Sequence, residues 1–224
     1  YYAGVTDGTT TKYRGSHYEI AGDTELSVLW DAYIDATAMS VEEVGTAMRN
    51  LLASGETRIT VNLPAEPTDE MYKALRRAII ETPDVEICTI DLNLLGAKVI
   101  GVKAFAYHAD GTPEAPRALR SVFLPDATLI KEGAFRDLSI ISVSAPRVTE
   151  IERSAFYGNT DLAEIYFPKL KVVGNSAFGY GAFEEVTLPE LTIVDTWSFA
   201  LCENLKVLNL PKVEEVKRGA FYGS

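Results

Sequence analysis

Few side chains of this sequence have the types and spacing that catalysis needs. The segment GNSAFG (174–179) is similar to the turn that presents a nucleophilic serine, but that turn needs glycine two positions after the serine, where this sequence has Phe178. The segment GYGAFE (179–184) begins like a dinucleotide-binding loop, yet Glu184 stands where a small residue must pack, and a strand-like stretch follows. A structural repeat explains both segments better than an active site does.

Histidine and cysteine are too scattered to predict a metal or redox site. The histidines are His17 and His108, and a surface loop explains His108 with Asp110 better than a metal or proton-transfer pair, because no cysteine cluster or supporting residue accompanies them. Cys88 and Cys202 are far apart in the sequence, so we expect both to be reduced and structural. We therefore expect no enzyme, no cofactor and no bound metal.

Charge and hydropathy exclude further classes. The 32 acidic and 21 basic side chains give a net charge of -11, which repels phosphate backbones, so we expect no nucleic-acid partner. Adjacent carboxylates, as in Glu184-Glu185 and Glu214-Glu215, are typical of a solvated face. We expect no membrane span, because no apolar run is long enough, and the polar N-terminus has no signal segment, although a leader can have been removed.

A period of 21 or 22 residues runs through the C-terminal half. Prolines mark it at Pro125, Pro146, Pro168, Pro189 and Pro211. A phenylalanine follows each proline ten residues later, and Ala104-Phe105 fits a leading unit with a longer insert. The phenylalanines expected in the core are Phe105, Phe135, Phe156, Phe178, Phe199 and Phe221. A period of this length is typical of units that cannot bury their apolar faces alone and must stack.

Each unit predicts a strand that ends at its proline. Segments such as LAEIYFP, FEEVTLP and LKVLNLP alternate apolar and polar residues, the period of a half-buried strand. Proline lacks the amide donor and so stands past the last ladder bond. Because the chain stops three residues after Phe221, we expect the last unit to be truncated, with an unprotected edge.

The N-terminal half has a different pattern. Residues 1–24 are rich in Gly, Thr and Tyr, and we expect a flexible arm with little regular structure. Strands are predicted at 26–30, 58–63 and 85–92, with helices between them that begin after Ser40 and Thr68 and present apolar stripes. The spacing predicts right-handed parallel crossovers. Residues 25–97 are therefore interpreted as an α/β cap continuous with the repeats, and a separate α/β domain is the alternative.

The residues of the C-terminal half resemble the BspA-type bacterial surface leucine-rich repeats, whose units read approximately L-x-x-V-x-[IL]-P-x-x-[VL]-x-x-I-x-x-x-A-F. The resemblance covers roughly residues 98–224, with an insertion at 106–118 and departures at Ala145 and Ser198. It implies an α/β fold, a right-handed leucine-rich-repeat solenoid with a parallel sheet on one face and, here, a helical N-terminal cap. It also implies export to a bacterial surface, associated with the outer membrane, with a lipid anchor on a removed leader as one means of attachment.

The resemblance implies a non-enzymatic module that binds a protein on a host or neighbouring cell. The sequence indicates where: residues two before each proline form an outward row, and those four before it form a flanking row. The candidate binding residues in these rows are Phe123, Tyr166, Glu164, Glu185, Thr187 and Asn209. Aromatic rings bordered by carboxylates can anchor a protein segment. The alternatives are an exposed sheet that merely tolerates such residues, and a structural or assembly element of the cell envelope.

Overall fold

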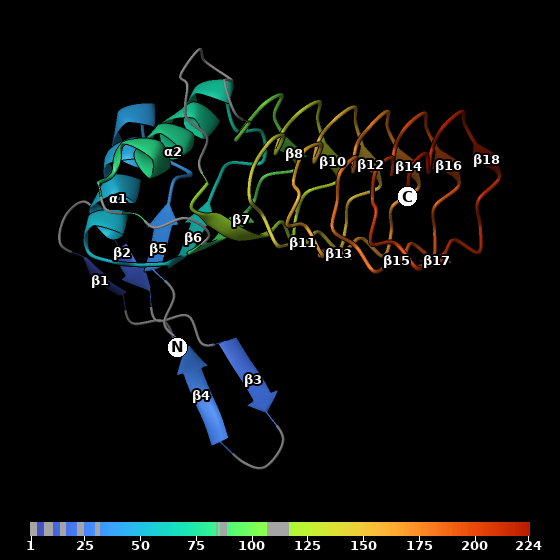
Figure 1. Ribbon diagram of the computed structural model, residues 1–224. Helices are drawn as coiled ribbons and strands as arrows, with labels where there is room; N and C mark the ends of the chain where they lie inside the picture. The colour runs from blue at the N-terminus through green and yellow to red at the C-terminus, as the bar shows by residue number, and fades with distance from the viewer. Residues whose placement is uncertain are drawn as a thin grey trace.

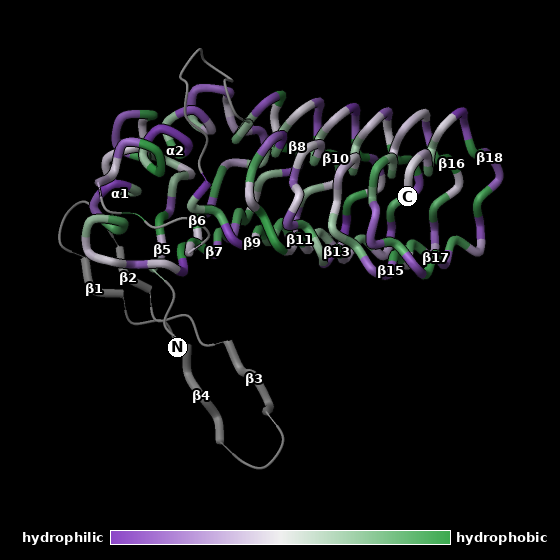
Figure 2. Tube along the Cα trace, viewed as in Figure 1, coloured by the Kyte–Doolittle hydropathy of each residue, from purple (hydrophilic) through white to green (hydrophobic). Residues whose placement is uncertain are grey.

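The computed structural model in Figure 1 describes residues 4–6, 11–13, 17–21, 25–29, 32–83, 85, 89–106 and 117–224. Parallel strands succeed one another along a stack, and two helices lie at its N-terminal end, which makes an α/β repeat fold. Figure 2 shows hydrophobic stretches that recur at matching places in successive turns of the stack.

Antiparallel hairpins precede the parallel sheet. They are β1 (Gly4–Thr6) with β2 (Thr11–Tyr13), and β3 (His17–Ala21) with β4 (Glu25–Leu29). The expectation of little regular structure over 1–24 is wrong for these strands, because Thr, Tyr, Val and Ile favour extended backbone even without a visible period. The strand expected at 26–30 is present as β4, but it belongs to a hairpin and not to the parallel sheet.

The parallel sheet begins at β5 (Ala32–Asp35), a strand that the sequence analysis missed. Its other strands, in order, are β6 (Arg58–Asn62), β7 (Ile90–Leu95), β9 (Leu119–Phe123), β11 (Ser142–Ser144) and β13 (Glu164–Tyr166). One sheet therefore runs from the N-terminal crossovers into the repeats, as expected. We expected β7 at 85–92; its register with β6 pairs Asp91 with Arg58 and so places it later, while residues 84 and 86–88, Cys88 included, lie outside the described residues.

The crossover helices begin where their capping residues predict. They are α1 (Val41–Ala53) and α2 (Asp69–Glu81). The Ser40 amide donates to Glu43 Oε2 at 2.7 Å and the Glu43 amide to Ser40 Oγ at 3.3 Å, which is a capping box. Thr68 Oγ1 accepts from the Met71 amide at 3.3 Å. The expected stripe of α2 is buried, whereas Val41 of the α1 stripe is exposed.

The second helix lies against the first repeat. The Tyr72 hydroxyl donates to the Val99 carbonyl at 2.8 Å, and Arg76 Nη1 donates to the carbonyls of Lys103 at 3.2 Å and Ala104 at 3.0 Å. Burial raises the pKa of Tyr72 well above its ordinary value, and the nearby Asp69 raises it further. Tyr72 and Arg76 of α2 thus satisfy three backbone carbonyls of the first repeat.

A second parallel ladder runs opposite the first, where the resemblance implied a sheet on one face only. Its strands are β8 (Val99–Ile100), β10 (Leu129–Ile130), β12 (Glu150–Ile151), β14 (Val172–Val173), β16 (Ile193–Val194) and β18 (Glu215–Val216). The second residue of each strand points into the core and is fully buried up to Val194, whereas Val216 of β18 is exposed. Successive repeats are therefore joined through the second ladder along its whole length and, over β9, β11 and β13, through the first sheet as well (Figure 1).

A column of phenylalanine rings fills the space between the ladders. The column is Phe105, Phe135, Phe156, Phe178, Phe199 and Phe221, with successive ring centroids 5.2 to 5.6 Å apart and planes within 17° of parallel. All are fully buried except the half-buried Phe221. Tyr72 of α2 meets the first ring edge-on at 6.0 Å. One ring per repeat thus supplies the packing between layers.

A left-handed residue precedes the alanine or serine beside every ring. These residues are Lys103, Gly133, Ser154, Ser176, Trp197 and Gly219, with φ between 52° and 66°. The next residue follows a turn tight enough for its small side chain to lie in the core; Ala155, Ala177 and Ser198 are all fully buried. The backbone conformation, and not only the sequence, therefore repeats from unit to unit.

Candidate binding surface

The strands that precede the prolines present alternate residues to solvent. In β11 the central Val143 is buried, while Ser142 and Ser144 on either side are partly exposed. In β13 Glu164 and Tyr166 are exposed, and Tyr166 retains 57% of its surface. Because successive side chains of a strand point to opposite faces, the outward residues of neighbouring strands form rows across the sheet.

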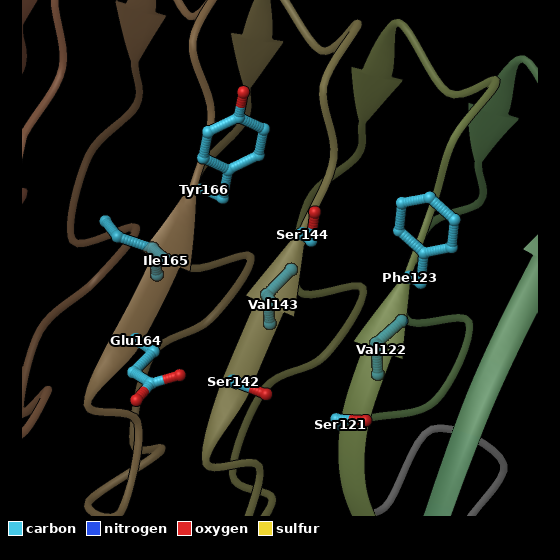
Figure 3. Close-up of a pocket in the computed structure, with 9 residues that line it drawn as sticks. All are labelled: Ser121, Val122, Phe123, Ser142, Val143, Ser144, Glu164, Ile165 and Tyr166. Carbon is cyan, nitrogen blue, oxygen red and sulfur yellow. The ribbon is translucent and has the colours of Figure 1, made fainter. Parts of the chain in front are cut away.

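The parallel register brings Phe123 and Tyr166 into one such row. Phe123, Ser144 and Tyr166 are lateral partners in β9, β11 and β13. Neighbouring strands lie about 4.8 Å apart, so the Cα atoms of the two aromatic residues are roughly 10 Å apart. On the strand between them, the side chain at this position is the small hydroxymethyl group of Ser144. A notch one strand wide therefore separates the two rings (Figure 3).

An open hollow of about 500 Å³ lies over these strands (Figure 3). Its lining consists of Ser121, Val122, Phe123, Ser142, Val143, Ser144, Glu164, Ile165 and Tyr166. Val122 and Val143 are buried, whereas Ile165 at the matching position of β13 is only half-buried. The hollow therefore combines aromatic rings, hydroxyl groups and an apolar floor.

Glu164 carries the charge of the hollow, because the other residues that line it are serines and apolar or aromatic residues. Figure 3 shows its carboxylate beside Ser142, in the flanking row formed by Ser121, Ser142 and Glu164. Among the described residues, no lysine or arginine forms an ion pair with Glu164. This carboxylate is available to a ligand.

The carboxylate on the other side of the hollow has partners within the chain. Asp91 of β7 accepts hydrogen bonds from Arg120 Nε at 2.9 Å and Ser121 Oγ at 2.6 Å, and it forms an ion pair with Arg120 Nη2. Partial burial opposes ionisation of Asp91, but the bonds from Arg120 and Ser121 outweigh it and hold the pKa below its ordinary value. Arg58, the lateral partner of Asp91 on β6, also favours its ionised form, so the carboxylate at this border is already paired within the chain.

The row of Phe123, Ser144 and Tyr166 continues toward the N-terminus with polar residues. Asn93 is the lateral partner of Phe123, and Thr60 is that of Asn93. Asn93 Nδ2 donates to Thr60 Oγ1 at 3.1 Å, and Thr60 is buried. Tyr33 of β5 is in turn the lateral partner of Thr60, so Thr60 and Asn93 separate this third aromatic residue of the row from the pair Phe123 and Tyr166.

The structure separates the remaining candidate residues from these. Glu185 and Thr187 lie on β15 (Glu185–Thr187) and Asn209 on β17 (Val207–Asn209), which pair with each other in a ladder apart from β13. Glu185 accepts from the Thr187 hydroxyl at 3.3 Å. The six candidates thus divide into a group at the hollow, namely Phe123, Glu164 and Tyr166, and a group beyond it.

The first sheet is interrupted between β13 and β15. Among the described residues, the bond from the Leu124 amide to the Ser144 carbonyl recurs from Ala145 and from Leu188, but the equivalent amide of Phe167 has no such bond. We attribute this gap to two rings that replace smaller aliphatic residues, Phe167 before its proline and Phe183 six before the next. Both rings contact Phe178, at 5.9 and 5.8 Å, and the added volume widens the layer.

Sequence reasoning did not find this interruption or the half-exposed Ile165 beside it. The signal was present, because the position before proline otherwise holds Leu124, Ala145, Leu188 or Leu210 and the position six before it holds leucine or isoleucine. Phe167 in one unit and Phe183 in the next are larger than the residues at the same positions of the other units. They mark the place where one repeat differs in size from its neighbours.

The residues considered for chemistry occupy repeat positions. Ser176 has φ 54° and donates to Asn175 Oδ1 at 2.9 Å, and its left-handed backbone is that of its counterparts in other units. Cys202 is buried, which raises its pKa to about 11, and its thiol contacts the Phe178 carbonyl at 3.3 Å. In the part of the chain that the structure describes, no three His, Cys, Asp or Glu residues cluster as metal ligands. His108 and Asp110 lie outside that part.

No helix within the described ranges is long and apolar enough to span a membrane. The exposed large apolar side chains gather instead at the C-terminal end of the stack and in the aromatic row. Those at the end include Val207, Leu208, Val216 and Tyr222, which retain 41 to 61% of their surface.

A comparison with known protein families identifies the repeats of the C-terminal residues. Residues 118–224 match the BspA type leucine rich repeat region in six copies. No curated protein and no solved structure matches the chain. Repeats of this family generally mediate protein-protein interaction and are generally non-enzymatic. The match, together with the two parallel ladders and the repeated Ala-Phe turn, identifies residues 118–224 as a region of BspA-type leucine-rich repeats.

Proposed function

We propose that this chain is a non-enzymatic binding module of the bacterial cell surface, which adheres to a protein on a host or neighbouring cell through the face of β9, β11 and β13. In this proposal residues 98–224 are a right-handed solenoid, residues 25–97 are its α/β cap, and residues 1–24 are an arm that leads from a removed, lipid-anchored leader. The observation that supports a binding role is the hollow that Phe123, Tyr166 and Glu164 line together.

Several features support the hollow as a contact surface. Its aromatic residues lie around a depression and are not scattered singly, which is the arrangement of anchor residues in protein interfaces. Its floor is rigid, because Val122 and Val143 lie in strands paired on both sides. The α2 contacts with Val99 and Ala104 support the cap, since they cover the first turn of the repeats.

The test removes the two rings together. Phe123→Ser/Tyr166→Ser should keep the melting temperature within a few degrees, because neither ring belongs to the buried column. Adhesion of beads coated with the variant to cultured epithelial cells and to other bacteria should fall. For a purified receptor the affinity should drop at least about 30-fold, or about 2 kcal/mol.

The matched control is Tyr222→Ser. Tyr222 is as exposed as Tyr166, at 61% against 57%, but lies on the turn beside Trp197 and away from the hollow. It should leave adhesion unchanged. If the double variant adheres like wild type, the contact surface is elsewhere; if it unfolds, the rows face the core. Antibody binding to intact cells of the source organism tests the surface location.

A further inference from the structure

The groups that line the hollow, and the spacing of its two rings, limit the kind of side chain that it can bind. Phe123 and Tyr166 stand on either side of Ser144, whose side chain is too short to fill the space between them. Their Cα atoms are roughly 10 Å apart, since they are two strands apart in the sheet. Two rings at this separation can hold one flat group between them, each ring contributing a face or an edge.

The charge of the hollow favours a cation. Asp91, at the other end of the flanking row, has a partner within the chain, Arg120. Glu164 is exposed and has no ion pair among the described residues; Glu185 has none either, but it lies on β15, which is not paired with β13. The net charge of -11 also repels an anionic ligand at longer range. These charges disfavour an anion, whereas a cation would have Glu164 as its counter-ion.

Arginine fits this set of groups better than lysine. Its guanidinium is planar, stacks on aromatic faces and donates in a fork that matches a carboxylate. Ser144 and Glu164 are offset by one strand and two residues, about 8 Å between Cα atoms, which the length of the glutamate side chain reduces. A guanidinium between the rings therefore has a hydroxyl acceptor below it and a carboxylate on one side.

We propose that the hollow binds an arginine side chain presented by an extended segment of the partner protein, with the guanidinium between Phe123 and Tyr166, above Ser144, and Glu164 as its counter-ion. This inference rests on the proposed function, because it names the chemistry of the partner at the same surface. Ser121 and Ser142 accept or donate to the backbone of the bound segment, and the Asp91-Arg120 pair limits the hollow on the β7 side.

The experiment uses the full chain, labelled with ¹⁵N, and the capped peptide Ser-Gly-Ser-Arg-Ser-Gly-Ser. The comparison peptide carries citrulline, the uncharged planar analogue of arginine, at the same position. A single anchor side chain gives weak binding, on the order of millimolar, so amide chemical shifts are the suitable measurement. The arginine peptide should shift the amides of Phe123, Ser144, Glu164 and Tyr166, and the citrulline peptide should bind at least about fivefold more weakly.

Two isosteric variants separate Glu164 from the general acidity of the chain. Glu164→Gln should weaken the arginine peptide at least about threefold, whereas Glu185→Gln, which removes an exposed carboxylate from β15, should leave its affinity unchanged. Raising the salt concentration should weaken wild type and have little effect on Glu164→Gln. Circular dichroism establishes that both variants are folded.

The inference is wrong if the citrulline peptide binds as well as the arginine peptide, if Glu164→Gln binds like wild type, or if millimolar arginine peptide shifts none of these amides. The proposed function fails separately. If Phe123→Ser/Tyr166→Ser abolishes cell adhesion while the arginine peptide does not bind, the face is a binding surface for another side chain. If adhesion also persists in that variant, both ideas are wrong.

Discussion

Phe178 is the ring on which most of the packing between repeats converges. It is fully buried, and it stacks on Phe156 at 5.4 Å and on Phe199 at 5.2 Å. Phe167 and Phe183 meet it from the sheet side at 5.9 and 5.8 Å. Replacing Phe178 with alanine removes four ring contacts at once and leaves a cavity that its rigid neighbours cannot fill.

The cost of Phe178→Ala follows from these contacts. Truncating a buried phenylalanine destabilises by about 3–5 kcal/mol, and aromatic pairs contribute about 0.5–1.5 kcal/mol each beyond their buried area. With four such neighbours we expect the upper end of that range, about 4–5 kcal/mol. Phe221→Ala is the matched control, because Phe221 is half-buried and has one ring partner, Phe199 at 5.6 Å. It should cost about 1–2 kcal/mol.

Urea unfolding followed by circular dichroism measures both variants. Because contacts in a repeat protein join neighbouring units only, the m-value must be compared with that of wild type before a free energy is derived. A loss below about 1 kcal/mol for Phe178→Ala, or a loss equal to that of Phe221→Ala, refutes the assignment of this ring to the core between layers.

Three further predictions concern charge, backbone and thiol. Asp91→Asn should lower the free energy of unfolding by about 1 kcal/mol at pH 7, a modest value because the pair with Arg120 is partly exposed. The pKa of Asp91 is lower in the folded than in the unfolded state, so this stabilisation is present above the unfolded-state pKa and is lost as the pH falls through the folded-state pKa. The urea midpoints of the variant and the wild type should therefore converge in acid. A difference that stays constant with pH contradicts the role of the ion pair. Gly174→Ala should destabilise by about 1–3 kcal/mol in thermal melts, because a Cβ there would lie 2.8 Å from the Glu152 carbonyl carbon and 2.9 Å from the Arg153 nitrogen. Gly45→Ala in α1 should be neutral or stabilising, because its Cβ would lie at an ordinary contact distance, 3.5 Å, from Ala74 Cβ of α2. In a Cys88→Ser background, iodoacetamide at pH 8 should label Cys202 only at the rate of unfolding, because burial raises its pKa to about 11; rapid labelling of the folded chain would contradict its burial.

The predictable features are those that one unit, or one helix end, specifies locally. The offset between proline and phenylalanine located five of the six rings of the column, the Ala104-Phe105 pair located the first, and Ser40 with Glu43 located the start of α1. Both are patterns in which neighbouring residues determine the outcome. The strand β5 was missed because the sequence from 26 to 35 is largely apolar without a turn signal, and only the pairing in the structure distinguishes the hairpin strand β4 from the sheet strand β5.

The second ladder was missed for a related reason. Its strands have two residues each, too few for the alternation that marks a strand within one unit. An apolar residue does stand five positions after each proline, as at Ile130, Ile151 and Val173, but nothing within one unit marks that position as part of a strand. Their backbone bonds run between units, as from the Thr149 amide to the Thr128 carbonyl at 2.9 Å, and so depend on the stacking itself.

The candidate site combines a predictable part with an unpredictable one. The rows that contain Phe123, Tyr166 and Glu164 follow from strand alternation and the common register of the units. The hollow depends also on the packing of the core behind β13, where Phe167 and Phe183 surround Phe178. The sheet then ends at β13, and Ile165 stays half-exposed where its counterparts Val122 and Val143 are buried. In a protein built from equal units every strand would present a similar flat face, so a local departure from the repeat in the core is what gives one part of the surface a shape of its own.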